Sequence, residues 1–332
     1  MSKYPKWLGL SAIPVVLAIA GAVTNAQPPG KVFRIGYLDA STASGMAVLV
    51  HAFREELKKL GWMEGTNISI EYRFAEQKLD WVQELAAELV NQKPDLIVVS
   101  GRPSAIAAKK ETKLIPIVMA AAGDPVAANL VANLARPGGN IIGLSALAVE
   151  LNTKRLEILN EVVPRLNRVG VLRPPGASVG RELQLKDLRK ASASLNLKLE
   201  EIETQLEGKG LDEAFRTAKR KQINGIMTTY ATSFFTERKS IVELAGKYGY
   251  PAIYFQKEFV DDGGLMSYGA DYVDLYRRTA VYVDKILKGA KPAELPVQQA
   301  TKFEFIINLK AAKQIGLTIP ARVLERANQV IK

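Results

Sequence analysis

The stretch AAAGDPVAANLVANLARPGGNIIGLS, residues 120–145, shows the pattern from which the fold is predicted. An apolar run ends in Gly-Asp-Pro, a segment with helical spacing follows, and a Pro-Gly-Gly-Asn turn leads into a second apolar run. Asp124 stands where the first run stops. It can cap a helix that Pro125 opens or face a cleft beyond a buried strand, and the two roles are compatible. We expect the turn at 137–140 to carry the chain into a strand that crosses to a second domain.

Apolar runs of strand length recur in two sets, about 130 residues apart along the chain. The first set lies at 33–38, 68–72, 96–99 and 115–120, and the second at 169–172, 197–202, 225–228 and 251–255. Because amphipathic segments separate the runs, the sequence predicts two α/β halves. Each half is expected to be a parallel sheet with right-handed crossovers and helices on both faces.

Two features predict where the first helices lie. Apolar residues recur at 46, 49, 50, 53, 57 and 60, the spacing of one helical face. Asp80 followed by Gln83 has the spacing of a capping box, which predicts that the next helix begins there. His51, the only histidine, falls opposite the apolar face and is expected at the surface.

The N-terminus has the order of a secretory signal peptide. Lys3 and Lys6 precede an apolar run at 8–23, and small residues follow up to Ala26. We expect cleavage after Ala26 and export to the periplasm. An uncleaved membrane anchor is the alternative, although the run is shorter than the ~20 residues that a span needs. The chain has no cysteine to carry the acyl chains of a lipoprotein, so it is expected to be free after export.

The formal net charge of +11 raises the question of a nucleic-acid partner. The basic residues are spread beside acidic ones, as in FREELKKL and TERKSIVEL, and form no block of five or more. This pattern favours solvated helix faces over a nucleic-acid surface, so no nucleic-acid partner is expected.

Ligands of open α/β sheets bind beyond the carboxyl ends of the strands, where the strand order reverses. Six loops at such ends are expected to face one cleft between the halves. From the first half we select Asp39, Ser41, Thr42, Ser44, Arg102, Ser104 and Asp124, and from the second Arg173, Tyr230, Gln256 and Tyr268. Arg102 precedes Pro103 at a predicted helix start, and an arginine beside a helix N-terminus suits an anion. A solvent-exposed loop arginine and core aromatic residues are the alternative interpretations.

Hydrolytic catalysis requires a nucleophile beside a base, or a metal ion. With one histidine, no nucleophile elbow, no dinucleotide fingerprint and no phosphate-binding loop, the sequence favours a binding protein without metal or cofactor.

Three long runs resemble one known family, the tryptophan-binding-like branch of ABC-transporter substrate-binding proteins. They are FREELKKLGWMEGTNISIEYRFAE at 53–76, GDPVAANLVANLARPGGNIIGLS at 123–145, and AIYFQKEFVDDGGLMSYGADYVDLYRRT at 252–279 with its continuation to residue 320. The resemblance covers nearly all of the chain after the signal peptide. It implies a type I periplasmic binding fold with two Rossmann-like lobes and three hinge crossings. The expected N-terminal lobe comprises 31–143 and 270–292, and the C-terminal lobe comprises 144–269 and 293–332.

The resemblance also implies a monomeric receptor that closes on a small molecule and delivers it to a cognate ABC permease in the inner membrane. Characterised relatives bind aromatic amino acids. This sequence has Asp39 where the family commonly has serine, Arg102 at a usual threonine, and Arg173 and Pro174 at a usual Trp-Asn. We expect a carboxylate-bearing, amino-acid-like or aromatic ligand, with Arg102 for its carboxylate. A ligand sensor that presents its closed form to a membrane receptor and a secreted hydrolase are the alternatives.

Overall fold

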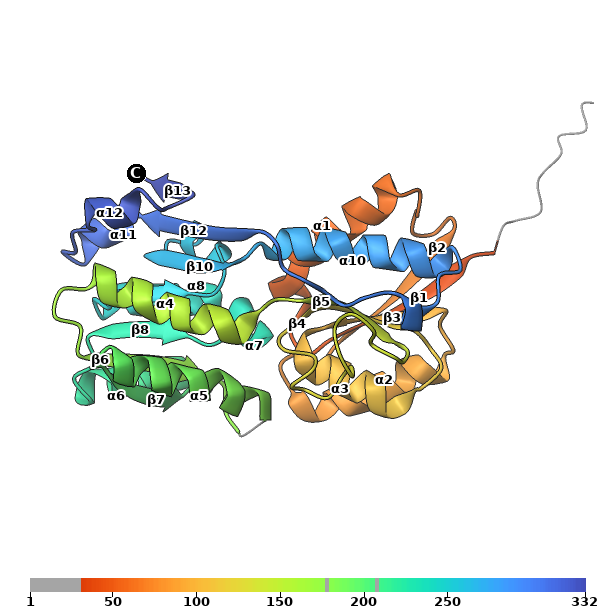
Figure 1. Ribbon diagram of the computed structural model, residues 1–332, viewed down its shortest axis with the longest axis horizontal. Coiled ribbons are helices and arrows are strands. Elements are labelled where there is room, and N and C mark those ends of the chain that lie inside the picture. The colour runs from red at the N-terminus through yellow and green to blue at the C-terminus, as the bar shows by residue number, and fades with distance from the viewer. Residues whose placement is uncertain (1–30, 177–178, 207–208) are drawn as a thin grey trace, which may run out of the picture. The chain divides into compact units, whose positions relative to one another are not determined.

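The computed structural model describes residues 31–332, apart from 177, 178, 207 and 208. The predicted signal peptide, 1–26, lies outside the described residues. Residues Val32–Lys332 form one compact unit. Within it the strands make two separate sheets, which we call the first and the second lobe together with their helices (Figure 1).

The first lobe is built on a six-stranded sheet in the order β11-β5-β4-β3-β1-β2, with every pair parallel. Its strands are β1 (Phe33–Asp39), β2 (Ile68–Phe74), β3 (Leu96–Ser100), β4 (Ile117–Ala122), β5 (Ile141–Ser145) and β11 (Gln298–Gln299). Its helices are α1 (Ala43–Lys59), α2 (Leu79–Asn91), α3 (Gly101–Glu111), α10 (Tyr272–Leu287) and the short η1 (Pro292–Glu294). Helices α1 and α10 pack on each other over one face, while α2 and α3 cover the other. The inner strands β3 and β4 are buried along their whole length, so they appear in the sequence as continuous apolar runs.

The second lobe repeats this layout in a seven-stranded sheet, β13-β12-β10-β9-β8-β6-β7. Its strands are β6 (Arg168–Arg173), β7 (Lys198–Glu203), β8 (Gly225–Thr228), β9 (Ala252–Tyr254), β10 (Met266–Ala270), β12 (Phe303–Asn308) and β13 (Gln329–Ile331). Its helices are α4 (Ala148–Val162), α5 (Val179–Ser194), α6 (Gly210–Arg220), α7 (Thr232–Thr236), α8 (Arg238–Lys247), α9 (Glu258–Asp261), α11 (Leu309–Gln314) and α12 (Ala321–Leu324). Only the β10–β12 pair is antiparallel among the strand pairs described.

The chain passes between the two lobes three times. It leaves the first lobe after β5, returns at Asp271 between β10 and α10, and leaves again between β11 and β12. Helix α10 packs against α1 and β4. The turn at 137–140 leads into the strand β5, which pairs with β4 in the first lobe, and the chain crosses to the second lobe directly after this strand. The expected boundary after 143 therefore falls inside β5, and the one after 292 falls before β11 pairs with β5.

Short polar side chains cap the first turns of α1 and α10, the two longest helices of the first lobe. Thr42 caps α1 by accepting a hydrogen bond from the Gly45 N–H at 3.0 Å, and Asp271 caps α10 in the same way. The predicted capping box at Asp80 was wrong. Helix α2 begins at Leu79 with no side-chain cap, so Asp80 lies in its first turn, and Gln83 bonds to Glu111 of α3 instead.

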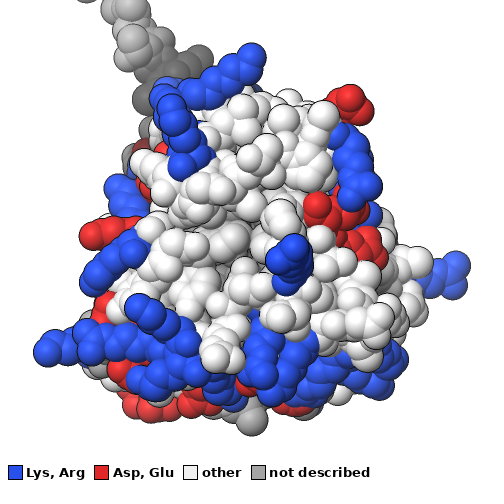
Figure 2. Space-filling model, turned by 90° about the vertical axis from the view of Figure 1, so that its left-hand side faces the viewer, with Lys and Arg blue, Asp and Glu red and all other residues white. Residues whose placement is uncertain are grey.

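Basic and acidic side chains lie beside one another on the surface of the second lobe. Figure 2 shows Lys and Arg along the lower part of one end of the molecule, with Asp and Glu among them. Glu200, for example, pairs with Lys198 at 2.8 Å and with Lys221 at 2.9 Å. In the described part of the chain, no helix has both the length and the apolar character that a membrane crossing requires.

Candidate functional site

A cavity of about 210 Å³ lies between the carboxyl ends of the strands of the two sheets. The first lobe contributes Ala40, Gln77, Leu79, Asp124, Gly123 and 101–103, and the second contributes Pro174, Pro175, Gln184, Gln205, Leu206 and 229–233. Strand order reverses between β1 and β3 in one sheet and between β6 and β8 in the other. Loops after all four of these strands reach the cavity, so it lies at the switch points of both sheets.

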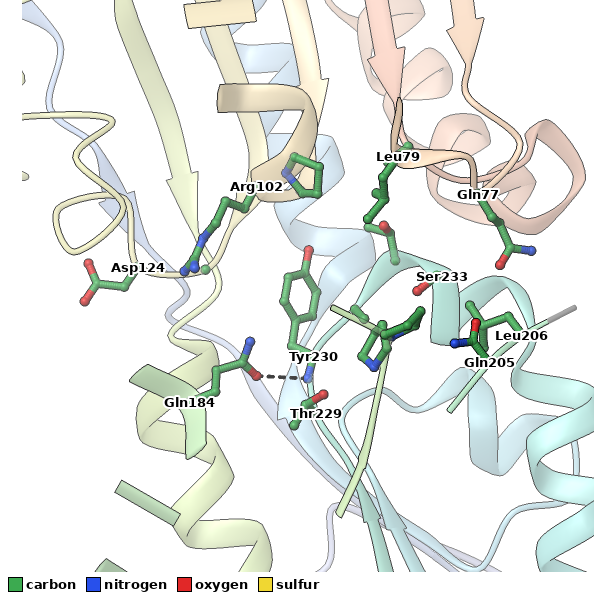
Figure 3. A pocket seen from close by; sticks show the side chains of 18 residues that line it. Gln77, Leu79, Arg102, Asp124, Gln184, Gln205, Leu206, Thr229, Tyr230 and Ser233 are labelled. Atoms are coloured by element: carbon green, nitrogen blue, oxygen red, sulfur yellow. Dashed lines mark hydrogen bonds between the residues drawn. The ribbon is translucent and has the colours of Figure 1, made fainter. Parts of the chain in front are cut away.

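The first lobe places two opposite charges on the cavity wall. Arg102 is half-buried in the first turn of α3, and Figure 3 shows it reaching towards the loop that carries Asp124. Burial lowers the pKa of the Arg102 guanidinium, while the nearby charge of Asp124 opposes this shift. The Arg102 guanidinium stays charged at neutral pH, because an arginine pKa lies far above 7.

Asp124 also holds the turn that follows it. Its Oδ1 accepts hydrogen bonds from the backbone N–H groups of Val126 and Ala127, both at 3.0 Å. The helix expected from Pro125 onward was wrong, because the structure has turns there instead. The capping geometry and the place on the cavity wall are both present, so the two roles considered for Asp124 coexist.

Tyr230 closes the cavity from the second lobe. Its ring stacks on Tyr272 at 5.6 Å between centroids and meets Phe255 edge-on at 5.5 Å. Its hydroxyl donates to the Ala121 carbonyl of the first lobe at 2.8 Å, and burial raises its pKa. The ring is therefore fixed in place, and its hydroxyl proton is already engaged within the protein.

Other contacts join the lobes beside the cavity. Gln77 Nε2 donates to Glu237 Oε1 at 2.9 Å, and the hydroxyls of Ser41 and Thr236 are in contact. The cavity is thus bounded by contacts that hold the two lobes together. Among the described residues, no group of three or more acidic or histidine side chains could hold a metal ion.

The sequence model of the family described as ABC transporter substrate binding protein matches residues 41–331. The chain belongs to this family. A tyrosine-binding protein of Clostridioides difficile (strain R20291) is 29% identical over 268 residues, which make up 80% of this chain and 75% of the relative.

Solved structures agree with this substrate-binding protein in fold. A conserved domain protein of Vibrio cholerae is 30% identical, with a TM-score of 0.82 over 90% of this chain and 100% of the other. An ABC domain in complex with L-Trp from Streptococcus pneumonia is 25% identical, with a TM-score of 0.81 over 91% of this chain and 100% of the other. The family expected from the sequence, with its tryptophan-binding-like branch, and the two-lobed α/β fold are confirmed.

Of the site residues selected from the sequence of this substrate-binding protein, Arg102, Asp124 and Tyr230 line the cavity. The other first-lobe candidates do not. Asp39, Ser41 and Ser104 are fully buried, and Ser44 is exposed on the outside of α1 next to the cap Thr42. Asp39 is buried at the end of β1, where its Oδ1 accepts from the Ser41 N–H at 2.8 Å. Burial raises its pKa to about 6.

The remaining second-lobe candidates also point elsewhere. Arg173 turns towards the edge strand β7 and pairs with Glu203 at 2.8 Å, so only the prolines that follow it reach the cavity. Gln256 is buried beside Glu258. Tyr268 lies within β10 and packs its ring edge-on against Phe305 at 6.1 Å.

Several cavity residues of the substrate-binding protein were not selected from the sequence. Gln77 and Leu79 follow β2, and Gln205 and Leu206 follow β7, so the rule of strand carboxyl ends would have found them had it been applied to the edge strands. Gln184 lies on α5, well after its strand, and no local pattern marks it.

Proposed function

We propose that this substrate-binding protein is the periplasmic receptor of an ABC importer and binds an amino acid with an aromatic or other apolar side chain in the cavity between the lobes. One observation carries the proposal. Arg102 and Asp124 place a positive and a negative charge on a wall that also carries proline, leucine, alanine and tyrosine side chains beside uncharged glutamine, threonine and serine side chains. An amino acid has this combination of two opposite charges and one apolar body.

Each part of such a ligand has a complementary surface. The guanidinium of Arg102 suits the α-carboxylate, and the carboxylate of Asp124 suits the α-ammonium. Leu79, Leu206 and Tyr230 offer apolar contact area for the side chain. The cavity of about 210 Å³ suits a ligand of a single residue better than an oligopeptide.

The relatives support an amino-acid ligand with a ring. One curated relative is named a tyrosine-binding protein, and one structural neighbour is a complex with L-Trp. Arg102 and Pro174 differ from the residues common in the family. L-tryptophan and L-tyrosine are therefore the first amino acids to test, and the proposal does not assign them as the substrates.

Binding is proposed to close the lobes around three crossing segments. A ligand that contacts both lobes favours the closed form, and moving a population from about 1% to about 99% closed requires about 5.5 kcal/mol of differential affinity. The contact between Tyr230 and the Ala121 carbonyl is one that would form on closure. The closed form would then be recognised by the membrane permease.

Replacing Arg102 tests the site. Arg102→Ala should weaken binding of L-tryptophan or L-tyrosine roughly tenfold to a hundredfold, because a charge-assisted hydrogen bond contributes ~1.5 to 3 kcal/mol. Arg322→Ala, an exposed arginine on α12, is the matched control and should bind as the unmodified protein does. Calorimetric titration measures both. Equal affinity of Arg102→Ala and the control would remove Arg102 from the site.

A further inference from the structure

Gln184 has one end of its side-chain amide fixed within the protein. It lies on α5 and is only 8% exposed, yet it lines the cavity. Its Oε1 accepts two hydrogen bonds at 3.2 Å, one from the backbone N–H of Tyr230 and one from Nδ2 of Asn152. The acceptor end of the amide is therefore already used.

The donor end of Gln184 faces the cavity. Figure 3 shows the bond from Oε1 to the Tyr230 nitrogen, and it shows Nε2 pointing to the side of the cavity where Arg102 lies. Two N–H groups from the second lobe thus approach the same region as the guanidinium from the first lobe.

Asn152 and Arg155, together with the backbone N–H of Tyr230, determine which way the Gln184 amide is turned. Arg155 carries only donors, so the Asn152 oxygen must face it, and one of its guanidinium nitrogens does bond to Asn152 Oδ1. The Asn152 nitrogen is then left to face Gln184, whose oxygen must turn to meet it. Two amides alone could bond to each other in either orientation of their oxygen and nitrogen atoms. The arginine at the end of this chain of hydrogen bonds leaves only one orientation.

Arg155 is unusual in its own right. It is 1% exposed, its other terminal nitrogen donates to the Tyr268 carbonyl of β10 at 2.9 Å, and both of these partners are uncharged. Burial lowers the pKa of its guanidinium to about 10. Burying a charge is costly unless its donors are used. Here the two terminal nitrogens are used, one on the strand and one on the amide that supports the cavity wall, while Nε has no hydrogen-bond partner among the described residues.

We infer that Gln184 donates an N–H to the ligand and determines specificity for an acceptor there, with Asn152 and Arg155 as positioning residues. This inference rests on the proposed function, under which the acceptor is the amino-acid carboxylate. That group would be held by Arg102 from one lobe and by Gln184 from the other. Ligands without a carboxylate would then lose contacts to both lobes, and closure would depend on this group.

Asn152→Asp separates positioning from simple structural support. The two side chains have the same shape, and the introduced carboxylate still accepts from Arg155, now as an ion pair. It has no N–H for Gln184. The amide is expected to turn its nitrogen towards the new carboxylate and away from the cavity, and to give up the hydrogen bond from the Tyr230 N–H. Calorimetry should show affinity for L-tryptophan or L-tyrosine falling at least tenfold. The midpoint of thermal unfolding without ligand should not fall. A purely structural role of Asn152 would lower this midpoint together with the affinity.

Two controls complete the experiment. Asn160→Asp makes the same change on the same helix at a half-buried position and should leave affinity unaltered. In the ligand-free protein, NMR should show fast solvent exchange for the Gln184 side-chain N–H protons and slow exchange for those of Asn152. The reverse exchange pattern would overturn the inference without any ligand.

The outcomes distinguish the two proposals. Unchanged affinity of Asn152→Asp, or a loss of affinity that only parallels a loss of stability, overturns the role of Gln184 while the amino-acid site stands. If the unmodified protein binds neither amino acid, the proposed function fails, and the exchange measurement still decides how Gln184 is oriented.

Discussion

A substitution at Gly45 is expected to push the two lobes apart without disturbing the packing within either lobe. It lies in the first turn of α1 and faces Thr236 of α7 in the second lobe. A Cβ atom at Gly45 would lie 2.7 Å from Cγ2 of Thr236 and 2.8 Å from its Cβ, with Oγ1 closer still. Ordinary carbon contacts are about 3.5 to 4.0 Å, so Gly45→Ala requires the lobes to separate by about 1 Å at this point.

The expected effects on stability and affinity have opposite signs. Overpacking of a close contact costs about 1 to 3 kcal/mol, which corresponds to about a fivefold to hundredfold loss of affinity if the contact forms only on closure. Alanine is the better helix former by up to about 1 kcal/mol, so the ligand-free protein should be as stable as before or slightly more stable.

Calorimetry with L-tryptophan or L-tyrosine and thermal unfolding without ligand measure the two effects separately. Thr236→Gly removes all three of the opposing atoms, and combining it with Gly45→Ala should restore most of the affinity lost in Gly45→Ala alone. Unchanged affinity, or affinity and stability falling together, would refute the claim that this contact belongs to closure.

Three further predictions concern stability and the core. Burial raises the pKa of Glu258 from 4.5 to about 7, so the folded state binds more protons than the unfolded state between these pH values. The free energy of unfolding should therefore fall by up to about 3 kcal/mol as pH rises from 4.5 to about 7. Urea unfolding should show that Glu258→Gln lacks this pH dependence. Gly143 has a φ of +125° and lies against the Met119 backbone, so Gly143→Ala should lower the free energy of unfolding by at least about 2 kcal/mol in the same assay. Trp62→Phe removes a 2.9 Å hydrogen bond to Asp284 of α10 and should cost about 1 kcal/mol of stability, while calorimetry finds ligand affinity unchanged.

The sheets could be predicted because buried parallel strands have continuous apolar sequences. Strand β8 lies at 225–228 as expected, and the other expected strands differ by a few residues at their ends. The capping box at Asp80 could not be rejected from spacing alone. In the structure the helix begins one residue earlier, at Leu79. The spacing of residues along the sequence does not show at which residue a helix begins.

Only part of the cavity followed from the rule that ligands bind beyond strand ends. Arg102, Asp124 and Tyr230 lie there, but the rule does not specify which way a side chain points. Asp39 ends β1 and is buried, because the Ser41 N–H and a tyrosine hydroxyl bind its carboxylate there. Gln184 comes from a helix face, and only the three-dimensional arrangement of α4 and α5 brings its partners to it.

The central claim is that the cavity binds an amino acid through both of its charged groups. The direct measurement is calorimetric titration of the protein after unfolding and refolding to release any retained ligand. The proposed function predicts binding of one L-tryptophan or L-tyrosine per chain, with tryptamine, which lacks the carboxylate, and indole-3-propionate, which lacks the ammonium, each at least tenfold weaker. Absence of binding by both amino acids, together with tight binding of an uncharged sugar or nucleoside, would contradict it.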